Sequence, residues 1–87
     1  MATTPSEILI NNTVYTRIVN NQNTYLIQNA GTGLISIAAS DVDLGATTSS
    51  DLGGYKIESL RAIDNSQLKD FAYVYAKSFY DTGVVRV

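Results

Sequence analysis

Residues 24–38, TYLIQNAGTGLISIA, place two short runs of β-forming residues on either side of a turn that contains two glycines. Tyr, Leu and Ile dominate the runs, and residues 29–33 between them have the composition of a hairpin loop. A loop of that length predicts an antiparallel hairpin in which Ile27 lies opposite Ile35. Alternating side chains would then share one face, as a sheet packed on a core requires. These side chains are Tyr25, Ile27, Ile35 and Ile37.

The chain outside this stretch continues to alternate between strand-forming runs and polar turns. Residues 14–19 predict a strand that ends in an Asn-rich turn. Residues 40–54 form a long polar connection, and a connection of that length in a small domain is typically functional or mobile. Residues 55–63 favour a strand, although a helical face also fits them, and a short helical turn follows at 66–70.

The C-terminal residues predict a second hairpin. Residues 72–80 and 84–87 are strand-like and flank a turn at Thr82 and Gly83. A two- or four-residue loop would place an aromatic stripe on one outer face, whereas a three-residue loop would shift the pairing by one position. The four residues predicted to share this face, as a subunit interface, are Tyr73, Tyr75, Phe79 and Val84. The alternative is that the same side chains face a second sheet.

These patterns predict an all-β fold in a single domain. The expected architecture is a small antiparallel β-sandwich or jelly-roll-like barrel of six to seven short strands, with at most one short helical turn near 66–70. The domain is expected to span residues 1–87, with 1–7 as a flexible N-terminal arm.

Composition excludes several classes of function. The chain has 87 residues, no Cys and no His, so disulfides, the usual catalytic triads and most transition-metal sites are not expected. The net charge is −2 and the basic residues are scattered, which argues against nucleic acid binding. No secretory signal or membrane-spanning apolar run is present in the sequence. Only 16% of residues are charged while 45% are hydrophobic, which favours an apolar surface covered in an assembly.

Three pairs or stripes of residues could carry other chemistry. Asp41 and Asp43 resemble the start of a calcium loop, but further oxygen ligands and a late Glu are missing, so an ordinary Asp-rich turn is favoured. Asp51 and Glu58 could in principle act as a glycosidase pair, which nothing else in the sequence supports. The aromatic stripe could bind sugar by stacking. No cofactor is expected.

Two blocks resemble a known group of proteins. Residues 24–38, with their strand ending in Gln-Asn, glycine turn and strand ending in Ile-Ala, are similar to a segment of small virion proteins of tailed bacteriophages. Residues 74–78, VYAKS, followed by 82–87, TGVVRV, resemble the end of such proteins. The resemblance implies a non-enzymatic β-sandwich subunit repeated on a virion, made in the host cytoplasm. It carries over no functional residues.

The expected function is therefore that of a structural subunit of a phage particle. A capsid decoration protein that binds the lattice of the major capsid protein is favoured, and a subunit of the tail or of a tail-fibre adaptor is the alternative. A carbohydrate-binding module is a further alternative from another class. Expected partners are other virion proteins and further copies of the chain in a trimer or hexamer, with neither nucleic acid nor membrane.

Overall fold

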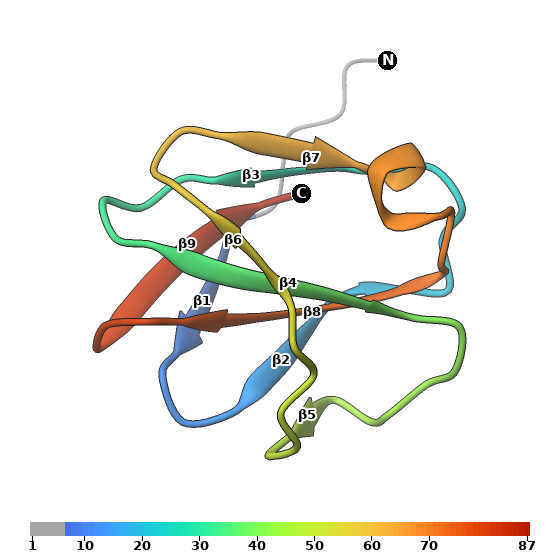
Figure 1. Cartoon of the computed structure of the whole chain (residues 1–87), viewed down its shortest axis with the longest axis horizontal. Coiled ribbons are helices and arrows are strands. Elements are labelled where there is room, and N and C mark those ends of the chain that lie inside the picture. The colour runs from blue at the N-terminus through green and yellow to red at the C-terminus, as the bar shows by residue number, and fades with distance from the viewer. Residues whose placement is uncertain (1–6) are drawn as a thin grey trace.

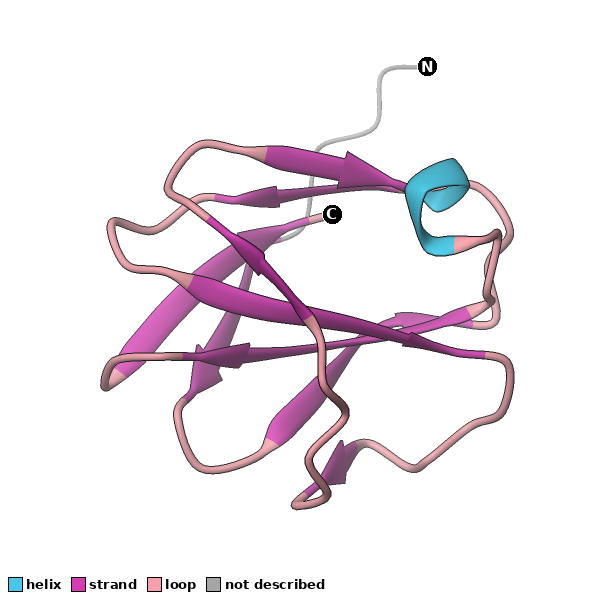
Figure 2. Ribbon diagram, in the orientation of Figure 1, coloured by secondary structure: helices cyan, strands magenta, loops and turns pink. Residues whose placement is uncertain are grey.

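The computed structural model describes residues 7–87, which form strands and one short helical turn (Figure 1). Strands hold 49% of residues and helix 5%, so the prediction of an all-β sandwich is confirmed (Figure 2). In chain order the elements are β1 (Glu7–Asn11), β2 (Tyr15–Asn20), β3 (Leu26–Asn29), β4 (Ile35–Ser40), β5 (Thr47–Thr48), β6 (Tyr55–Ile57), β7 (Ala62–Asp64), the 3₁₀ helix η1 (Asn65–Leu68), β8 (Tyr73–Ser78) and β9 (Thr82–Arg86).

The strands form two antiparallel sheets. Sheet A has the order β1-β9-β3-β7, and sheet B has the order β5-β2-β8-β4-β6. Apart from the two-residue strand β5, the strands form consecutive pairs in which one member lies in each sheet. These pairs are β1 and β2, β3 and β4, β6 and β7, and β8 and β9. This is the connectivity of an eight-stranded jelly roll, one of the two architectures that the sequence predicts.

The predicted hairpin of residues 24–38 is wrong in its pairing, because β3 and β4 lie in opposite sheets. β3 pairs with β7 and β9, while β4 pairs with β6 and β8. The predicted inward face is correct, since Ile27 and Ile35 belong to one buried cluster and meet within the sandwich interior. The buried Asn29 side chain holds the connection in place: it donates to Gly33 O at 2.8 Å and to Ile57 O at 2.9 Å.

The predicted C-terminal hairpin is wrong for the same reason. β8 lies in sheet B between β2 and β4, and β9 lies in sheet A between β1 and β3, so both strands have each edge occupied by another neighbour. The alternation along each strand is as predicted, because Val74, Ala76 and Val85 are all buried in the core. Their outward-facing neighbours consequently lie on opposite sides of the molecule.

Residues 7–87 contain nine strands, which is more than the predicted six to seven. The sequence analysis did not anticipate β1, and the predicted strand at 55–63 divides into β6 and β7. Of the predicted arm 1–7, residues 1–6 lie outside the described residues, and Glu7 is the first residue of β1.

The helical turn predicted near 66–70 is confirmed as η1. Asp64 caps it, because its carboxylate accepts from the backbone N–H groups of Ser66 and Gln67, and the Gln67 side chain accepts from the Asp64 N–H. This reciprocal arrangement is a capping box.

The core lies between the two sheets and is formed largely by aliphatic side chains. Its buried members are Ile10, Ile18, Val19, Tyr25, Ile27, Ile35, Ile37, Ile57, Ile63, Leu68, Val74, Ala76 and Val85. A second, smaller cluster of Tyr15, Ala38 and Tyr75 lies on the outer side of sheet B. Outward-facing aromatic residues of β2 and β8 are therefore buried as well, which requires a cover on that face.

Candidate functional site

The four predicted interface residues do not share one exposed face, so that prediction is wrong. Val84 belongs to β9 in sheet A, whereas Tyr73 and Tyr75 belong to β8 in sheet B and Phe79 directly follows it. The Tyr75 side chain is 0% exposed and Tyr73 is half-buried, while Phe79 is 47% exposed. The cause is the crossover from β8 to β9, which sends the two strands to different sheets.

Tyr75 is buried because residues 41–46, here called the strap, cross the outer face of sheet B. The Tyr75 hydroxyl accepts from Leu44 N at 2.8 Å and donates to Gly45 O at 2.8 Å. At the end of the strap, Arg17 N donates to Ala46 O at 2.9 Å. Tyr75, which was predicted from the sequence to belong to an interface, is therefore covered by part of the long 40–54 connection.

An ion pair fastens the strap to β2. Arg17 Nη1 lies 2.6 Å from Asp43 Oδ1. The backbone N–H of Gly45, and after it the Arg17 side chain, lower the pKa of the Asp43 carboxyl below its ordinary value. A calcium ion at Asp41 and Asp43 would compete with this arginine for the Asp43 carboxylate. Within residues 7–87 no group of three or more acidic or other metal-ligating side chains is gathered.

The other half of the same face is open and forms a groove. Its volume is about 500 Å³, within the usual range for small-molecule sites. The floor comes from β2, β4 and β8, and one wall comes from the connection after β5. Asn12 before β2 and Phe79 after β8 lie at the same end of sheet B, because β2 and β8 are antiparallel. The residues that line it are Asn12, Tyr15, Ser36, Ser49, Asp51, Gly53, Gly54, Lys77, Ser78 and Phe79. We call this cavity the sheet B groove.

Strand register brings the floor of the groove together. Lys77 on β8 pairs with Ser36 on β4, and Ser36 pairs on its other side with Lys56 on β6. The Tyr15 hydroxyl and Ser36 Oγ are 3.0 Å apart in a buried hydrogen bond. Lys77 Nζ lies 5.5 Å from the centroid of the Tyr15 ring, the geometry of a cation–π contact.

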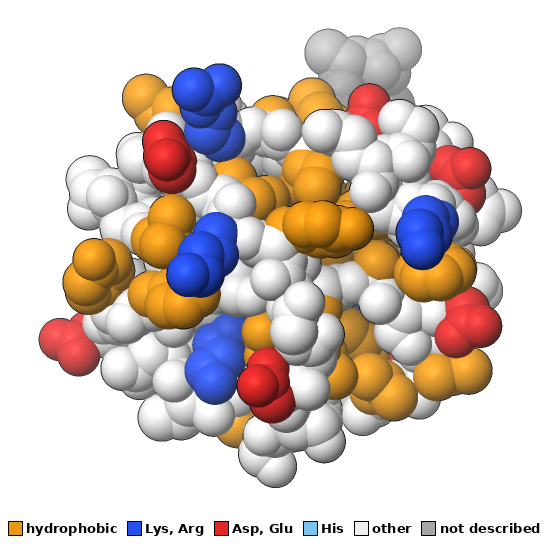
Figure 3. Space-filling view, viewed as in Figure 1, with side chains coloured by type: hydrophobic (Ala, Val, Ile, Leu, Met, Phe, Trp, Pro, Cys, Tyr) orange, Lys and Arg blue, Asp and Glu red, His pale blue; other side chains and the backbone are white. Residues whose placement is uncertain are grey.

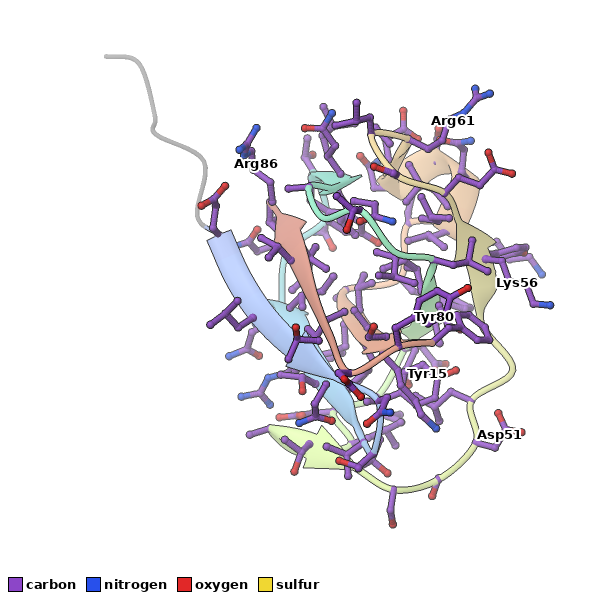
Figure 4. All side chains as sticks on the ribbon, turned by 90° about the vertical axis from the view of Figure 1, so that its left-hand side faces the viewer. Tyr15, Asp51, Lys56, Arg61, Tyr80 and Arg86 are labelled. Atoms are coloured by element: carbon purple, nitrogen blue, oxygen red, sulfur yellow. The ribbon has the colours of Figure 1, made fainter. Side chains whose placement is uncertain are left out.

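Phe79 extends the groove to the end of the sandwich. Lys56 Nζ lies 5.5 Å from the centroid of its ring. Neither Lys56 nor Lys77 has a carboxylate within 4.0 Å in the described part of the chain. Figure 4, which shows the sandwich edge-on, places Lys56, Tyr80 and Asp51 on the side of sheet B and Arg86 on the side of sheet A.

Asp51 and Glu58 do not form a catalytic pair around a single cavity. Asp51 lines the sheet B groove and accepts from Gly53 N at 3.0 Å, whereas Glu58 lines a different cavity beyond β6. The groove thus brings one carboxylate, amides and hydroxyls together with an aromatic edge. This set can bind a polar ligand by hydrogen bonds and stacking.

The outer face of sheet A presents a different surface. Leu9 on β1 is 76% exposed and pairs across the strands with Val84, and Leu26 on β3 is 61% exposed. Glu7 and Arg86 pair beside them at 2.7 Å. On the side that carries β6 of sheet B, apolar side chains lie in several patches separated by charged and polar groups (Figure 3). The outer face of sheet A therefore carries Leu9, Val84 and Leu26, with Arg86 and Gln28 between Leu9 and Leu26 in the strand register. Of these apolar residues, only Val84 was predicted from the sequence to lie on a surface.

Most residues of the two surfaces were missed because their sequence signals are weak. Tyr15, Ser36 and Lys77 are far apart in the chain and meet only through strand register. Leu9 lies in a five-residue strand that was not recognised. Ile8 is half-buried, Leu9 is exposed and Ile10 is buried. Because all three residues are apolar, the sequence does not show the alternation of polar and apolar residues that would reveal a strand.

Comparison with known proteins indicates no function, so the fold and these two surfaces are the basis for assigning one. None of the described helices is long and apolar enough to cross a membrane. No family model, curated protein or solved structure matches the chain.

Proposed function

We propose that this chain is a non-enzymatic structural subunit of a bacteriophage virion, and specifically a capsid decoration protein that binds the lattice of the major capsid protein. Attachment to the tail or to a fibre adaptor is the alternative position within the same particle. Copies of the chain would surround a symmetry axis of the particle as a trimer or hexamer.

The fold supports this proposal. Jelly rolls recur in viral capsid domains, although the same architecture also serves lectins, so the fold by itself does not decide between them. The two blocks that resemble phage virion proteins, 24–38 and 74–78 with 82–87, cover most of β3, β4, β8 and β9. In the two sheets, β3 is a neighbour of β9 and β4 is a neighbour of β8. The resemblance therefore falls on the framework of the sandwich.

The observation that carries the proposal is the exposure of two leucines on the outer face of sheet A. Leu9 and Leu26 project from strands with most of their surface in water, and Val84 lies beside Leu9. Burying a leucine of this kind contributes about 1.5–3 kcal/mol, so a few such contacts repeated around a particle would offset the cost of association. We assign the docking surface to this face, because the strap already covers the aromatic residues of β8.

The test is decoration of particles by a variant that keeps its fold. Leu9→Ser combined with Leu26→Ser removes both exposed leucines and leaves the core unchanged. Val42→Ser is the matched control, because Val42 is 55% exposed and belongs to the strap on sheet B. Phage particles that lack the protein are mixed with each variant and sedimented. The double variant should stay in the supernatant and the control should sediment with the particles; equal sedimentation of both would overturn the assignment.

A further inference from the structure

We propose that the sheet B groove is a binding site for a neutral saccharide. This goes beyond the proposed structural role and does not depend on it, because the groove lies on the opposite sheet from the exposed Leu9 and Leu26. A virion subunit with such a site would attach to particles by one face and present the other to glycans.

The polar groups of the groove match a polyhydroxylated ligand. Tyr15 and Ser36 share a single hydrogen bond between two hydroxyls, which leaves one O–H free to donate and lone pairs free to accept. The Lys77 ammonium lies over the Tyr15 ring without a carboxylate partner among residues 7–87, so its three donors are available. The Asp51 carboxylate uses one oxygen on Gly53 N and can accept from a ligand through the other.

The apolar part of the groove matches the hydrogen-bearing face of a sugar ring. Phe79 borders the cavity with about half of its side chain exposed and is held in place by the Lys56 ammonium over its ring. A saccharide needs donors, acceptors and an aromatic edge at the same time, and all three occur here. The charged groups that line the groove are Asp51 and Lys77, which have opposite sign, so the lining has no net charge that would favour an ionic ligand over a neutral one.

The wall of the groove is built close against the sheet. A Cβ atom on Gly54 would collide with the backbone oxygen of Ile37, so the chain between β5 and β6 passes β4 at a distance that only glycine permits. The same connection carries Asp51, which lines the groove together with Gly53 and Gly54. The floor residues Tyr15 and Ser36 are buried and hydrogen-bonded to each other, so this part of the binding surface is fixed before any ligand arrives.

The experiment is an NMR titration of the whole chain with glucose, galactose and N-acetylglucosamine and their disaccharides, with a hexaglutamate peptide as the acidic probe. At least one saccharide should shift the amide signals of Tyr15, Ser36, Asp51 and Lys77. Asp51→Asn and Lys77→Gln should each weaken that saccharide about tenfold, as the loss of a hydrogen bond to a charged group does. The matched controls Asp41→Asn and Lys69→Gln, both on exposed positions outside the groove, should bind as the wild type does.

Each other outcome overturns the proposal. Saturation by none of the saccharides at millimolar concentration would show that the groove is not a saccharide site. Shifts outside the groove, or equal affinity in the groove variants and controls, would place binding elsewhere. Tighter binding of hexaglutamate, strengthened by Asp51→Asn, would assign the groove to an acidic segment of a protein. Asp51 lies on an exposed loop, so its variant remains informative if Lys77→Gln does not fold.

Discussion

Tyr75 connects the core of sheet B to the strap, and two substitutions separate its ring from its hydroxyl. Tyr75→Phe keeps the buried ring and removes the oxygen that accepts from Leu44 N and donates to Gly45 O. Two hydrogen bonds of about 1 kcal/mol each are lost, and the freed strap groups can be rehydrated, so the expected cost is about 1–2 kcal/mol.

Tyr75→Ser removes the ring as well. The side chain is 0% exposed, and replacing a large buried aromatic by a small residue costs about 3–5 kcal/mol. For a domain of this length, 1 kcal/mol corresponds to about 4–8 °C in Tm. The two variants should therefore differ clearly in thermal unfolding followed by circular dichroism.

Hydrogen exchange then locates the effect. In Tyr75→Phe the amide of Leu44 should exchange faster, while amides of β3 and β9 in the other sheet should keep their protection. Tyr55→Phe is the matched control, because Tyr55 is 59% exposed and belongs to the edge strand β6 of the same sheet. A Tyr75→Phe protein with the Tm and the Leu44 exchange of the wild type would refute the role assigned to the hydroxyl.

Three further predictions concern the pH dependence of stability, the connection between β3 and β4 that Asn29 holds, and calcium. Acid should loosen the strap and η1, since hydrogen bonds from Gly45 N–H to Asp43 and from the Ser66 hydroxyl to Asp64 lower the pKa of each carboxyl below the ordinary 3.8. Their stabilisation is fully present above 3.8 and is lost as the pH falls through the lowered folded values, so Asp43→Asn and Asp64→Asn should flatten this acid limb of Tm against pH. Asn29→Leu should cost about 3 kcal/mol or more in urea unfolding, because three buried or half-buried partners, at Gly31, Gly33 and Ile57, lose their hydrogen bonds; a loss below about 1 kcal/mol would contradict the crossover role. Millimolar calcium or a chelator should leave Tm unchanged, because Arg17 occupies Asp43; a rise of many degrees with calcium would show a native-state site.

The alternation of side chains was predictable, and the pairing of strands was not. The alternation of side chains along each strand correctly predicted that Ile27, Ile35 and Val85 face the core. The same pattern is satisfied whether two strands are neighbours in one sheet or face each other across the sandwich, so it cannot distinguish a hairpin from a crossover. Residues 29–33 have hairpin composition, but the Asn29 side chain bonds to Ile57 of a distant strand, a contact that no local pattern reveals.

The two candidate surfaces depend on that pairing. The aromatic stripe of β8 was correctly placed opposite the core face, but the strap that covers Tyr75 comes from the long polar connection, whose path is set by tertiary hydrogen bonds. The groove requires Lys77 and Ser36 to be cross-strand partners. The exposure of Leu9 on sheet A requires β1, which reads from sequence as a short apolar run of no distinct period.

Quantitative mass spectrometry of gradient-purified phage particles tests the structural role most directly, using particles that encode this chain. The account predicts that the protein is retained through purification in a fixed ratio to the major capsid protein, and that the Leu9→Ser, Leu26→Ser variant is lost from otherwise intact particles. A protein that is abundant in the infected-cell lysate and missing from purified particles would contradict the account.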